Sequence, residues 1–412
     1  MTVYIIGAGL AGLSAATTAA AAGAHVVVLE SARQAGGRCR SYHDAALGLT
    51  IDNGNHFVAA GNHAVAAYLT RIGASDRLAG YAEARFDFVD LSSAMHWVLR
   101  PNAGRIPWWI GSRARRVPGT RTADYLRLAP LLRATRAETL DDVIPTAGTL
   151  WDRLLDMFFR SALNTPPHEA SARLAGAIVR ETMVAGGDAM RPRYAVPTLA
   201  AAFVDPALDY LAARGGEVRL ATRVRAIERA EGRVTALRIG ERAIAIEPGD
   251  RVIVAVPPWI AADLVPELTV PTAFHAIVNA HFACAPPAGV PAILAVLGGT
   301  AEWLVAHPDR ISVTVSAADA LAGEDRAAIA GRLWRDIQAA YGFTAAMPPF
   351  QVIKEARATF AATPAQDARR PGAPTAWRNL FLAGDWTATG LPATIEGAVR
   401  SGVTAAGLAV RA

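Results

Sequence analysis

Three glycines follow a short β-rich run, Val3–Ile6, at a spacing that suits the binding of a pyrophosphate. In Gly7-Ala8-Gly9-Leu10-Ala11-Gly12, the first glycine permits a tight turn and the second lets the backbone approach the phosphates. The third lets the following helix pack closely on the strand, so that its N-terminus faces the phosphates. Glu30 ends the next strand, 21 residues after Gly9, where a carboxylate can accept from ribose hydroxyls. The pattern predicts a dinucleotide site; a glycine-rich turn without a ligand is the alternative.

A second bend with a charged residue follows in "QAGGRCRS". Gly36 and Gly37 allow the chain to turn close to the first bend, and Arg38 can offer its charge to the pyrophosphate. A site for a nicotinamide dinucleotide alone does not need this second bend. The stretch therefore favours a larger dinucleotide cofactor.

A single carboxylate stands near the end of the chain, in "LAGDWTATGLPATIEGAVRSG". Asp385 closes an apolar run and is followed by ten uncharged residues, and a helix is expected from about Ala393. The sequence alone leaves two interpretations of Asp385, a ligand-binding acid or an ordinary helix cap. Glu396 is expected to be a first-turn helix residue without a catalytic role.

The elements that must position these residues alternate along the chain. Strands are expected at 3–6, 25–30, 217–220, 224–228, 234–239, 243–246, 251–256 and 380–383, and helices at 10–22, 124–136, 150–163, 171–184 and 319–341. The first strand, helix and second strand form a β-turn-α-β unit. We predict an α/β protein with a discontinuous, Rossmann-like nucleotide-binding domain at 1–75, 205–265 and 350–412, carrying a β-meander. A discontinuous mixed α/β substrate domain is expected at 76–204 and 266–349.

The composition supports a large folded core. Of 412 residues, 52% are hydrophobic and 19% charged, and the net charge of +5 comes almost wholly from arginine. We expect no nucleic-acid partner. Cys39 and Cys284 lie far apart and without metal-ligand spacing, which indicates a reducing, cytoplasmic compartment, no disulfide and no metal. The uncharged stretches 2–29 and 268–301 are interrupted by glycine or proline, so neither is expected to span a membrane.

Taken together, these motifs resemble those of the amine oxidase/phytoene desaturase superfamily of FAD proteins. The resemblance implies that Asn53 and Gly54 also lie beside the cofactor, and that Val224, in the "TRVRAI" strand, contacts adenine through its backbone. It implies further that Gly384 and Asp385 meet the ribityl-pyrophosphate. The helix start at Ala393, Thr394 and Ile395 would point at the flavin pyrimidine ring, where its dipole stabilises negative charge.

Two absences shape the expectation for the cofactor. No cysteine or histidine lies between Asp385 and Ser401, so no covalent flavin link is expected in that segment. No second GxGxxG motif appears, and the sequence identifies no electron donor. FAD is therefore expected to bind non-covalently.

Four stretches narrow the resemblance to one family. "IDNGNHF" at 51–57, "ALNTPP" at 162–167, "ARATFAATP" at 356–364 and the C-terminal stretch are similar to those of the hydroxysqualene dehydroxylases. That family commonly has glutamine where Asn55 stands. The resemblance implies hydride transfer from reduced FAD to an allylic carbon, with loss of water, giving squalene in hopanoid biosynthesis. It also implies a long apolar isoprenoid substrate, which residues 150–163 and 291–297 would enclose; ordinary core packing is the alternative.

His56 is the candidate catalytic residue, as a polar group near the flavin and a source of protons. A structural histidine explains it equally well. Asp52 could orient it, or be a buried turn carboxylate. The alternatives to the dehydroxylase are a carotenoid-type desaturase, an amine oxidase and a non-catalytic flavin or prenyl-lipid binding protein. Lys354, the only lysine, is not placed as amine oxidases place theirs, close to flavin N5.

A basic, tryptophan-containing segment, Arg100–Arg121, indicates peripheral contact with an anionic membrane surface. It holds six arginines, no acid and the pair Trp108-Trp109. It is too short and too charged to span a bilayer. The protein is thus expected on the inner face of the cytoplasmic membrane or free in the cytoplasm. The alternative interpretation is a solvated basic face with two core tryptophans.

Overall fold

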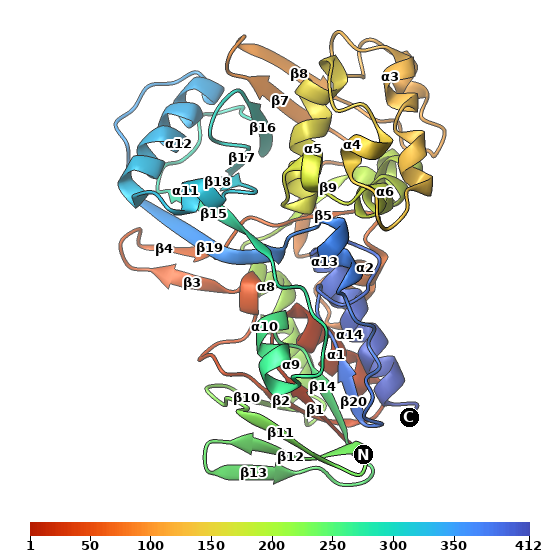
Figure 1. Cartoon of the computed structure of the whole chain (residues 1–412). Helices are drawn as coiled ribbons and strands as arrows, with labels where there is room; N and C mark the ends of the chain where they lie inside the picture. The colour runs from red at the N-terminus through yellow and green to blue at the C-terminus, as the bar shows by residue number, and fades with distance from the viewer.

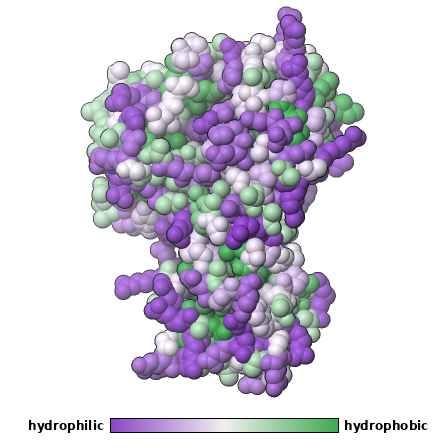
Figure 2. Space-filling model, viewed as in Figure 1, coloured by the Kyte–Doolittle hydropathy of each residue, from purple (hydrophilic) through white to green (hydrophobic).

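The computed structural model describes all 412 residues and shows two lobes joined by a narrower waist (Figures 1 and 2). The lower lobe in Figure 1 contains both chain termini and a parallel sheet in the order β10-β2-β1-β14-β20. Its strands are β1 (Thr2–Ile6), β2 (His25–Leu29), β10 (Glu217–Arg219), β14 (Arg251–Val254) and β20 (Leu380–Leu382). Strands far apart in sequence therefore pair in one sheet, as expected of a discontinuous nucleotide-binding fold.

Both faces of this sheet are buried, which explains its uninterrupted apolar strands. Val3 and Ile5 point into a core shared with helices α1 (Leu10–Ala21) and α14 (Ile395–Ala409), whereas Ile6 points into the opposite core. Gly402 lets the two helices touch, because an added Cβ would lie 2.3 Å from the Ala11 carbonyl oxygen. The opposite face is covered by the three-stranded meander β11 (Ala226–Ala230), β12 (Arg233–Ile239) and β13 (Arg242–Ala245).

The upper lobe is built on a seven-stranded mixed sheet in the order β19-β15-β18-β17-β16-β7-β8. Its strands are β7 (Phe86–Asp90), β8 (Met95–Leu99), β15 (Phe274–Phe282), β16 (Ile293–Leu297), β17 (Trp303–Ala306), β18 (Ile311–Val315) and β19 (Phe350–Phe360). Helices α11 (Asp319–Ala322) and α12 (Arg326–Tyr341) cover one face, where Val278 and Val313 meet Leu333. Ala295 instead joins the core formed with the inserted helices on the other side.

The inserted helices follow the bounds predicted for 150–163 and 171–184 but not those predicted for 124–136 and 319–341. They are α3 (Thr122–Leu126), α4 (Leu140–Val143), α5 (Asp156–Leu163), α6 (Ala172–Val179) and α7 (Gly187–Met190). The helix expected at 124–136 divides into α3 and a 3-10 turn at 129–133, because Pro130 lacks the N–H that a continuous helix needs. The helices expected at 150–163 and 171–184 each contain a π-helical turn, at 151–155 and 180–184. The helix expected at 319–341 breaks at Gly323, and Asp325 caps the second part.

Smaller elements connect the lobes. Two small sheets pair β3 (Ser41–Asp44) with β4 (Leu49–Asp52), and β5 (Phe57–Ala59) and β6 (Leu78–Gly80) with β9 (Pro192–Ala195). The remaining helices are α2 (His63–Arg71), α8 (Leu199–Phe203), α9 (Asp205–Ala212), α10 (Pro258–Leu264) and α13 (Pro364–Ala368).

The division into domains stays a prediction. Because β19 pairs along β15, a boundary near residue 361 follows the sheets better than one at 350.

Candidate functional site

The first bend, Gly7–Gly12, has open space beside one of its three glycines and none beside the other two. Gly7 has φ +106°, and an added Cβ would lie 2.6 Å from the Ala255 carbonyl oxygen. A Cβ at Gly12 would lie 1.9 Å from the Gly7 carbonyl oxygen, whereas a Cβ at Gly9 would meet nothing within 4 Å. Ala8 and Leu10 flank Gly9, and α1 begins at Leu10, followed by Ala11. The bend is thus shaped to expose its middle glycine and the N-terminus of α1, as a pyrophosphate requires.

The second bend packs directly on the first. The Gly36 N–H donates to the Ala8 carbonyl at 2.8 Å, and a Cβ at Gly37 would lie 3.3 Å from the Gly9 Cα. Both glycines have positive φ, 107° and 56°. Glu30 closes the third side, because its carboxylate accepts from the N–H groups of Ala8 and Ala32 at 2.7 and 2.8 Å. The three motifs that the sequence singled out therefore form one cradle.

Val224 lies beside this cradle but precedes strand β11, which begins two residues later than expected. The chain leading to it is tied to the cradle by the Thr222 N–H, which donates to the Glu30 carbonyl at 2.7 Å. The Val224 side chain is buried in the core, and its backbone N–H and C=O have no hydrogen-bond partner in the protein. Both groups are therefore free to pair with an adenine edge.

The carboxylate of Asp385 is buried and faces the second bend. Arg38 donates to Asp385 Oδ2 at 2.7 Å and to the Ala358 carbonyl at 2.5 Å, so it joins the two lobes. Gly384, with φ +148°, makes the turn that places Asp385 after β20. Arg38 and Asp385, both expected beside the cofactor, thus form an ion pair. Because this pair uses Asp385 Oδ2, Oδ1 remains to accept from a ligand hydroxyl.

Helix α14 starts where the sequence placed it. Thr394 caps it by accepting from the Gly397 N–H at 3.0 Å, Ala393 packs against the large core, and Ile395 is buried. Glu396 accepts from the N–H groups of Ala64 and Val65 at the start of α2. It therefore caps a neighbouring helix, which is a structural role.

Residues 53–57 run across four neighbouring strands of the upper sheet. Asn53 Nδ2 lies 3.5 Å from Glu355 of β19, and a Cβ at Gly54 would lie 3.0 Å from Asn279 Nδ2 of β15. Asn55 Nδ2 donates to Thr314 Oγ1 of β18 at 3.0 Å, and the Phe57 ring lies 5.7 Å from Trp303 of β17. The segment therefore lies on the sheet face away from α12, between the cradle and the inserted helices.

His56 lies within this segment and is close to Arg38. Burial, with the Arg38 guanidinium, lowers the pKa of His56 to about 4, against a smaller opposing effect of Asp385. The ring is therefore neutral at pH 7 and is a weak proton donor. Asp52 does not orient it, because that carboxylate accepts from the Ser41 hydroxyl at 2.6 Å and the Leu199 N–H at 2.9 Å.

The structure adds a buried carboxyl group that the sequence did not single out. The Glu302 side chain is 14% exposed, and its Oε2 accepts from the Ser316 N–H at 2.7 Å. Burial raises the pKa of Glu302 to about 7, and Arg160 of α5, 3.9 Å away, only partly opposes this. The neighbouring Trp303 donates to Ser161 of α5 at 2.8 Å. No local pattern distinguishes Glu302 from a surface glutamate, since its burial comes from the docking of α5.

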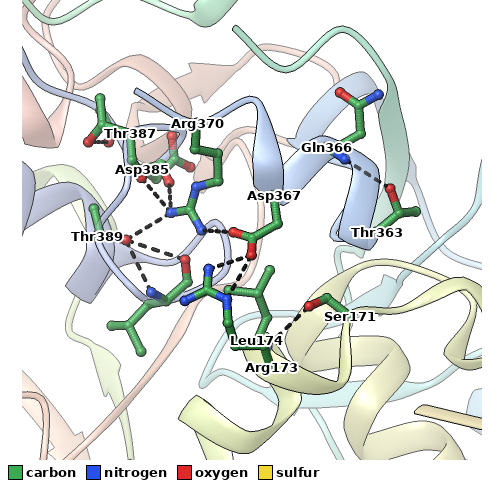
Figure 3. Close-up of polar contacts among 12 residues, drawn as sticks. Ser171, Arg173, Leu174, Thr363, Gln366, Asp367, Arg370, Asp385, Thr387 and Thr389 are labelled. Carbon is green, nitrogen blue, oxygen red and sulfur yellow. Dashed lines mark hydrogen bonds and ion pairs between the residues drawn. The ribbon is translucent and has the colours of Figure 1, made fainter. Parts of the chain in front are cut away.

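A second missed group is the buried arginine behind Asp385 (Figure 3). Arg370 donates to the carbonyls of Asp385 and Thr387 at 3.1 and 2.5 Å, and to Thr389 Oγ1 at 2.9 Å. It also pairs with Asp367, whose other oxygen accepts from Arg173 of α6. In a sequence rich in arginine, nothing local marks Arg370 as buried.

The residues present fit a flavin dinucleotide. The open space beside Gly9 at the start of α1 suits a pyrophosphate, the free backbone of Val224 suits adenine, and the buried Asp385 suits ribityl hydroxyls. Residues 53–57 and α5 meet at Trp303, which contacts Phe57 and Ser161 and follows Glu302 in the chain. A redox cofactor held here would face the apolar interior of the upper lobe.

Comparison with known proteins gives the family. Residues 10–410 match the model of the flavin containing amine oxidoreductases. The chain is 51% identical over 412 residues to the hydroxysqualene dehydroxylase of Rhodopseudomonas palustris, covering 100% of this chain and 99% of that protein. It is 49% identical over 407 residues to the enzyme of the same name from Zymomonas mobilis, covering 99% and 98%.

Solved structures of low sequence identity share the fold. An oxidoreductase from Methanosarcina mazei aligns with a TM-score of 0.73 at 16% identity, covering 98% of this chain and 99% of that one. Cyclohexylamine oxidase from Brevibacterium oxydans aligns with a TM-score of 0.72 at 18% identity, covering 100% and 99%. The predicted fold class and the FAD cofactor are therefore confirmed. The chain is an oxidoreductase of the flavin containing amine oxidoreductase family, and within it belongs with the hydroxysqualene dehydroxylases.

Proposed function

We propose that this protein converts hydroxysqualene to squalene by FAD-dependent reductive removal of the hydroxyl group. The observation that carries the proposal is the identity of about half of all positions, over the full length, with hydroxysqualene dehydroxylases. When bound in its reduced form, FAD supplies the hydride that replaces the hydroxyl at the allylic carbon. The hydroxyl takes up a proton and leaves as water, so that atoms and electrons balance.

The residues of the cradle, together with those of the segments around it, would hold the cofactor. Those that fit are Gly7, Ala8, Gly9, Leu10, Ala11, Gly12, Glu30, Gly36, Gly37, Arg38, Asn53, Gly54, Val224, Gly384, Asp385, Ala393, Thr394 and Ile395. The N-termini of α1 and α14 each present backbone N–H groups toward negative charge. This supports an anionic cofactor bound along both helix starts.

Glu302 is the residue best suited to give the leaving hydroxyl its proton. A carboxyl whose pKa is about 7 keeps its proton in about half of the molecules at neutral pH and can release it, as general acid catalysis requires. Glu302 lies where α5 meets the sheet face crossed by residues 53–57, next to the Trp303–Phe57 contact. His56, neutral at pH 7, would instead be a polar neighbour of the cofactor.

The apolar seam between α5 and the sheet suits a long isoprenoid chain. Leu154, Phe159 and Leu163 share one buried cluster with Ala295 of β16. Lys354 gives no support to an amine oxidase, because it bonds to the Glu324 carbonyl on the α12 side of the sheet. Its neighbour Glu355 faces Asn53 on the other side, as the alternation of a strand requires.

Anaerobic turnover tests the proposal. Acid precipitation of the purified protein should first release FAD, since the chain offers no covalent link near Asp385. Dithionite-reduced protein mixed with hydroxysqualene should then recover oxidised flavin absorbance, with one squalene formed per flavin. Unchanged absorbance would contradict the proposed function and indicate a binding protein. Reoxidation without squalene would indicate a different substrate.

We also propose that Arg100–Arg121 docks on an anionic bilayer, where such a substrate resides. Ile106 and Trp108 are 79% and 56% exposed, and the Arg115 guanidinium lies 4.8 Å from the centre of the Trp108 ring. Arg105 and Arg113 are exposed, and the segment holds no acid. Trp109 differs from expectation, because it is buried against Tyr125, with ring centres 5.1 Å apart. None of the helices combines the length and apolar composition that a transmembrane span requires.

A further inference from the structure

The loop that carries Asp385 is not fixed by packing alone. It lies between β20 and α14, and Gly384 and Gly390 at its ends both have positive φ. On one side, Thr387 and Thr389 border a half-open cavity of about 290 Å³, lined also by Ala64 and Arg400. A loop with space beside it needs polar contacts to hold its backbone in one conformation.

Arg370 supplies those contacts. Its guanidinium reaches the carbonyls of Asp385 and Thr387 and the hydroxyl of Thr389, so it spans most of the loop (Figure 3). The side chain is 1% exposed and lies 4.7 Å from the centre of the Phe360 ring. A planar group with five donors can hold several acceptors at once, which a lysine ammonium cannot do in the same geometry.

The buried charge of Arg370 depends on a pair from two other elements. Asp367 of α13, also 1% exposed, accepts from Arg370 Nη1 at 3.1 Å. Its second oxygen accepts from Arg173 Nε of α6 at 2.9 Å, and Arg173 is 30% exposed. The three side chains form a continuous ion network that begins on an inserted helix and ends on the backbone of Asp385. Breaking a buried pair leaves an uncompensated charge, so the network acts as a unit.

We propose that Arg370, held by Asp367 and Arg173, is a positioning residue for the flavin, acting through the Asp385–Thr389 loop. The network would set the direction of the Asp385 carboxylate and the start of α14, and would couple α6 to the cofactor. The inference rests on the proposed binding of FAD at Asp385 and not on the identity of the substrate. Arg370 would act on the flavin only through this loop.

The test compares FAD affinity among folded variants. Arg173→Gln removes the partly exposed end of the network, and Arg370→Lys keeps the charge but loses the fork. Arg180→Gln is the matched control, because Arg180 follows α6 directly and donates only to the Leu132 carbonyl. FAD-free protein is titrated with FAD by fluorescence quenching. Visible circular dichroism and the flavin reduction potential are then measured on the reconstituted protein.

We expect Kd for FAD to rise about tenfold in Arg173→Gln and in Arg370→Lys, with a changed flavin dichroism and potential. Arg173→Lys should restore most of the affinity, and Arg180→Gln should match the wild type. The effects of Arg173→Gln and Asp385→Ala should be less than additive, since they act through one contact.

Wild-type affinity, dichroism and potential in both network variants would overturn the proposal. So would a loss of affinity that merely follows a lower melting temperature of the FAD-free protein. If the variants lose FAD as expected while the wild type fails to produce squalene, the proposed function falls and the positioning role stands.

Discussion

The residues proposed to decide the chemistry here are ionisable groups that are at least partly removed from water. Asp385 and Arg38 form a 2.7 Å pair in which the acid is 7% exposed and the arginine 43%. Glu302 and His56 are shifted in opposite directions from their usual pKa values, both chiefly by burial, so that at pH 7 Glu302 is protonated in about half of the molecules and His56 is neutral. Burial favours the uncharged form of each group, which gives an acid with a proton to release and a histidine without one.

Replacing Asp385 should weaken FAD binding. Asp385→Ala removes a charged acceptor and leaves Arg38 unpaired, a loss of about 1.5–3 kcal/mol, or roughly 10- to 100-fold in Kd. Asp385→Asn, which keeps the shape and one acceptor, should lose less. Titration of FAD-free protein by fluorescence quenching measures both. Equal affinity in all three proteins would mean that the ribityl chain lies elsewhere.

Replacing Glu302 should slow the hydride step without releasing FAD. Glu302→Gln cannot give up a proton, and the rate should fall by about 10²- to 10⁴-fold. In the wild type, the rate should decline as pH rises through about 7, because Glu302 then loses its proton. Anaerobic stopped-flow records both effects. Glu241→Gln, an exposed change in the β12–β13 turn, is the control. If Glu302→Gln kept the wild-type rate and pH profile, another group would have to supply the proton.

At the scale of elements, the glycines of the cradle have different structural roles. Gly12 lets α1 pack against the first bend, whereas Gly9 faces open space. Helices α1 and α14 begin beside the two ends of the expected cofactor. The same parallel sheet carries both, since the carboxyl ends of β1 and β20 lie at one edge.

Two alanine substitutions separate folding from binding. Gly9→Ala places a methyl group in open space, so the melting temperature of the FAD-free protein should stay the same while Kd for FAD rises at least about tenfold. Gly12→Ala forces a Cβ to 1.9 Å from the Gly7 carbonyl oxygen, so this variant should melt far lower or fail to fold. Thermal scans and FAD titration give the comparison. Tight FAD binding by Gly9→Ala would place the pyrophosphate elsewhere.

At the scale of the whole molecule, polar contacts join the two lobes. Arg38 joins them through Ala358, and His281 of β15 joins them through the Asp52 carbonyl. His281 is fully buried, its Nε2 donating to that carbonyl at 3.0 Å and its Nδ1 accepting from Ser312 at 2.7 Å. A neutral ring satisfies both partners, whereas a second proton would place a positive charge in a fully buried site.

The stability of the fold should therefore depend on His281 in acid. Burial, with Arg310 nearby and against the opposing effects of the Asp52 carbonyl and Asp44, lowers the pKa of His281 to about 4. Its contribution is fully present above pH 6.5 and is lost as pH falls through about 4. The lowered pKa of His307 likewise reduces the free energy of unfolding in acid, whereas the raised pKa of Glu302 reduces it as pH rises. Urea unfolding at several pH values should show a weaker acid dependence for His281→Gln; identical dependence would exclude His281.

Membrane docking should respond to charge and to the exposed apolar pair. At low salt the protein should sediment with anionic liposomes and much less with neutral ones. Replacing Arg105, Arg113 and Arg121 with Gln should weaken this, at about 1 kcal/mol for each base. Ile106→Ala with Trp108→Ala should weaken it further at high salt, where charge is screened. Arg242→Gln and Leu220→Ala, exposed in the other lobe, are the controls. A wild type that ignores anionic liposomes would end the docking proposal.

The sequence by itself determined the local structure of the cradle, because its parts are short and locally specified. The turn at Gly7, the helix after Gly9 and the acid at the end of β2 follow from glycine conformation and strand–helix order. The start of α14 was likewise readable from Thr394 and the residues after it. Helix lengths in the insertions were not, since Pro130 and Gly323 interrupt patterns whose apolar periodicity continues.

Only the tertiary structure decided which of many similar polar residues are buried together. Arg370 and Arg173 look like any other arginines, and their link through Asp367 spans nearly two hundred residues. Glu302 gains its shifted pKa from burial in a place where α5, more than a hundred residues away in the chain, approaches the sheet. Burial and charge pairing depend on how distant elements pack, and a local pattern carries no record of that packing.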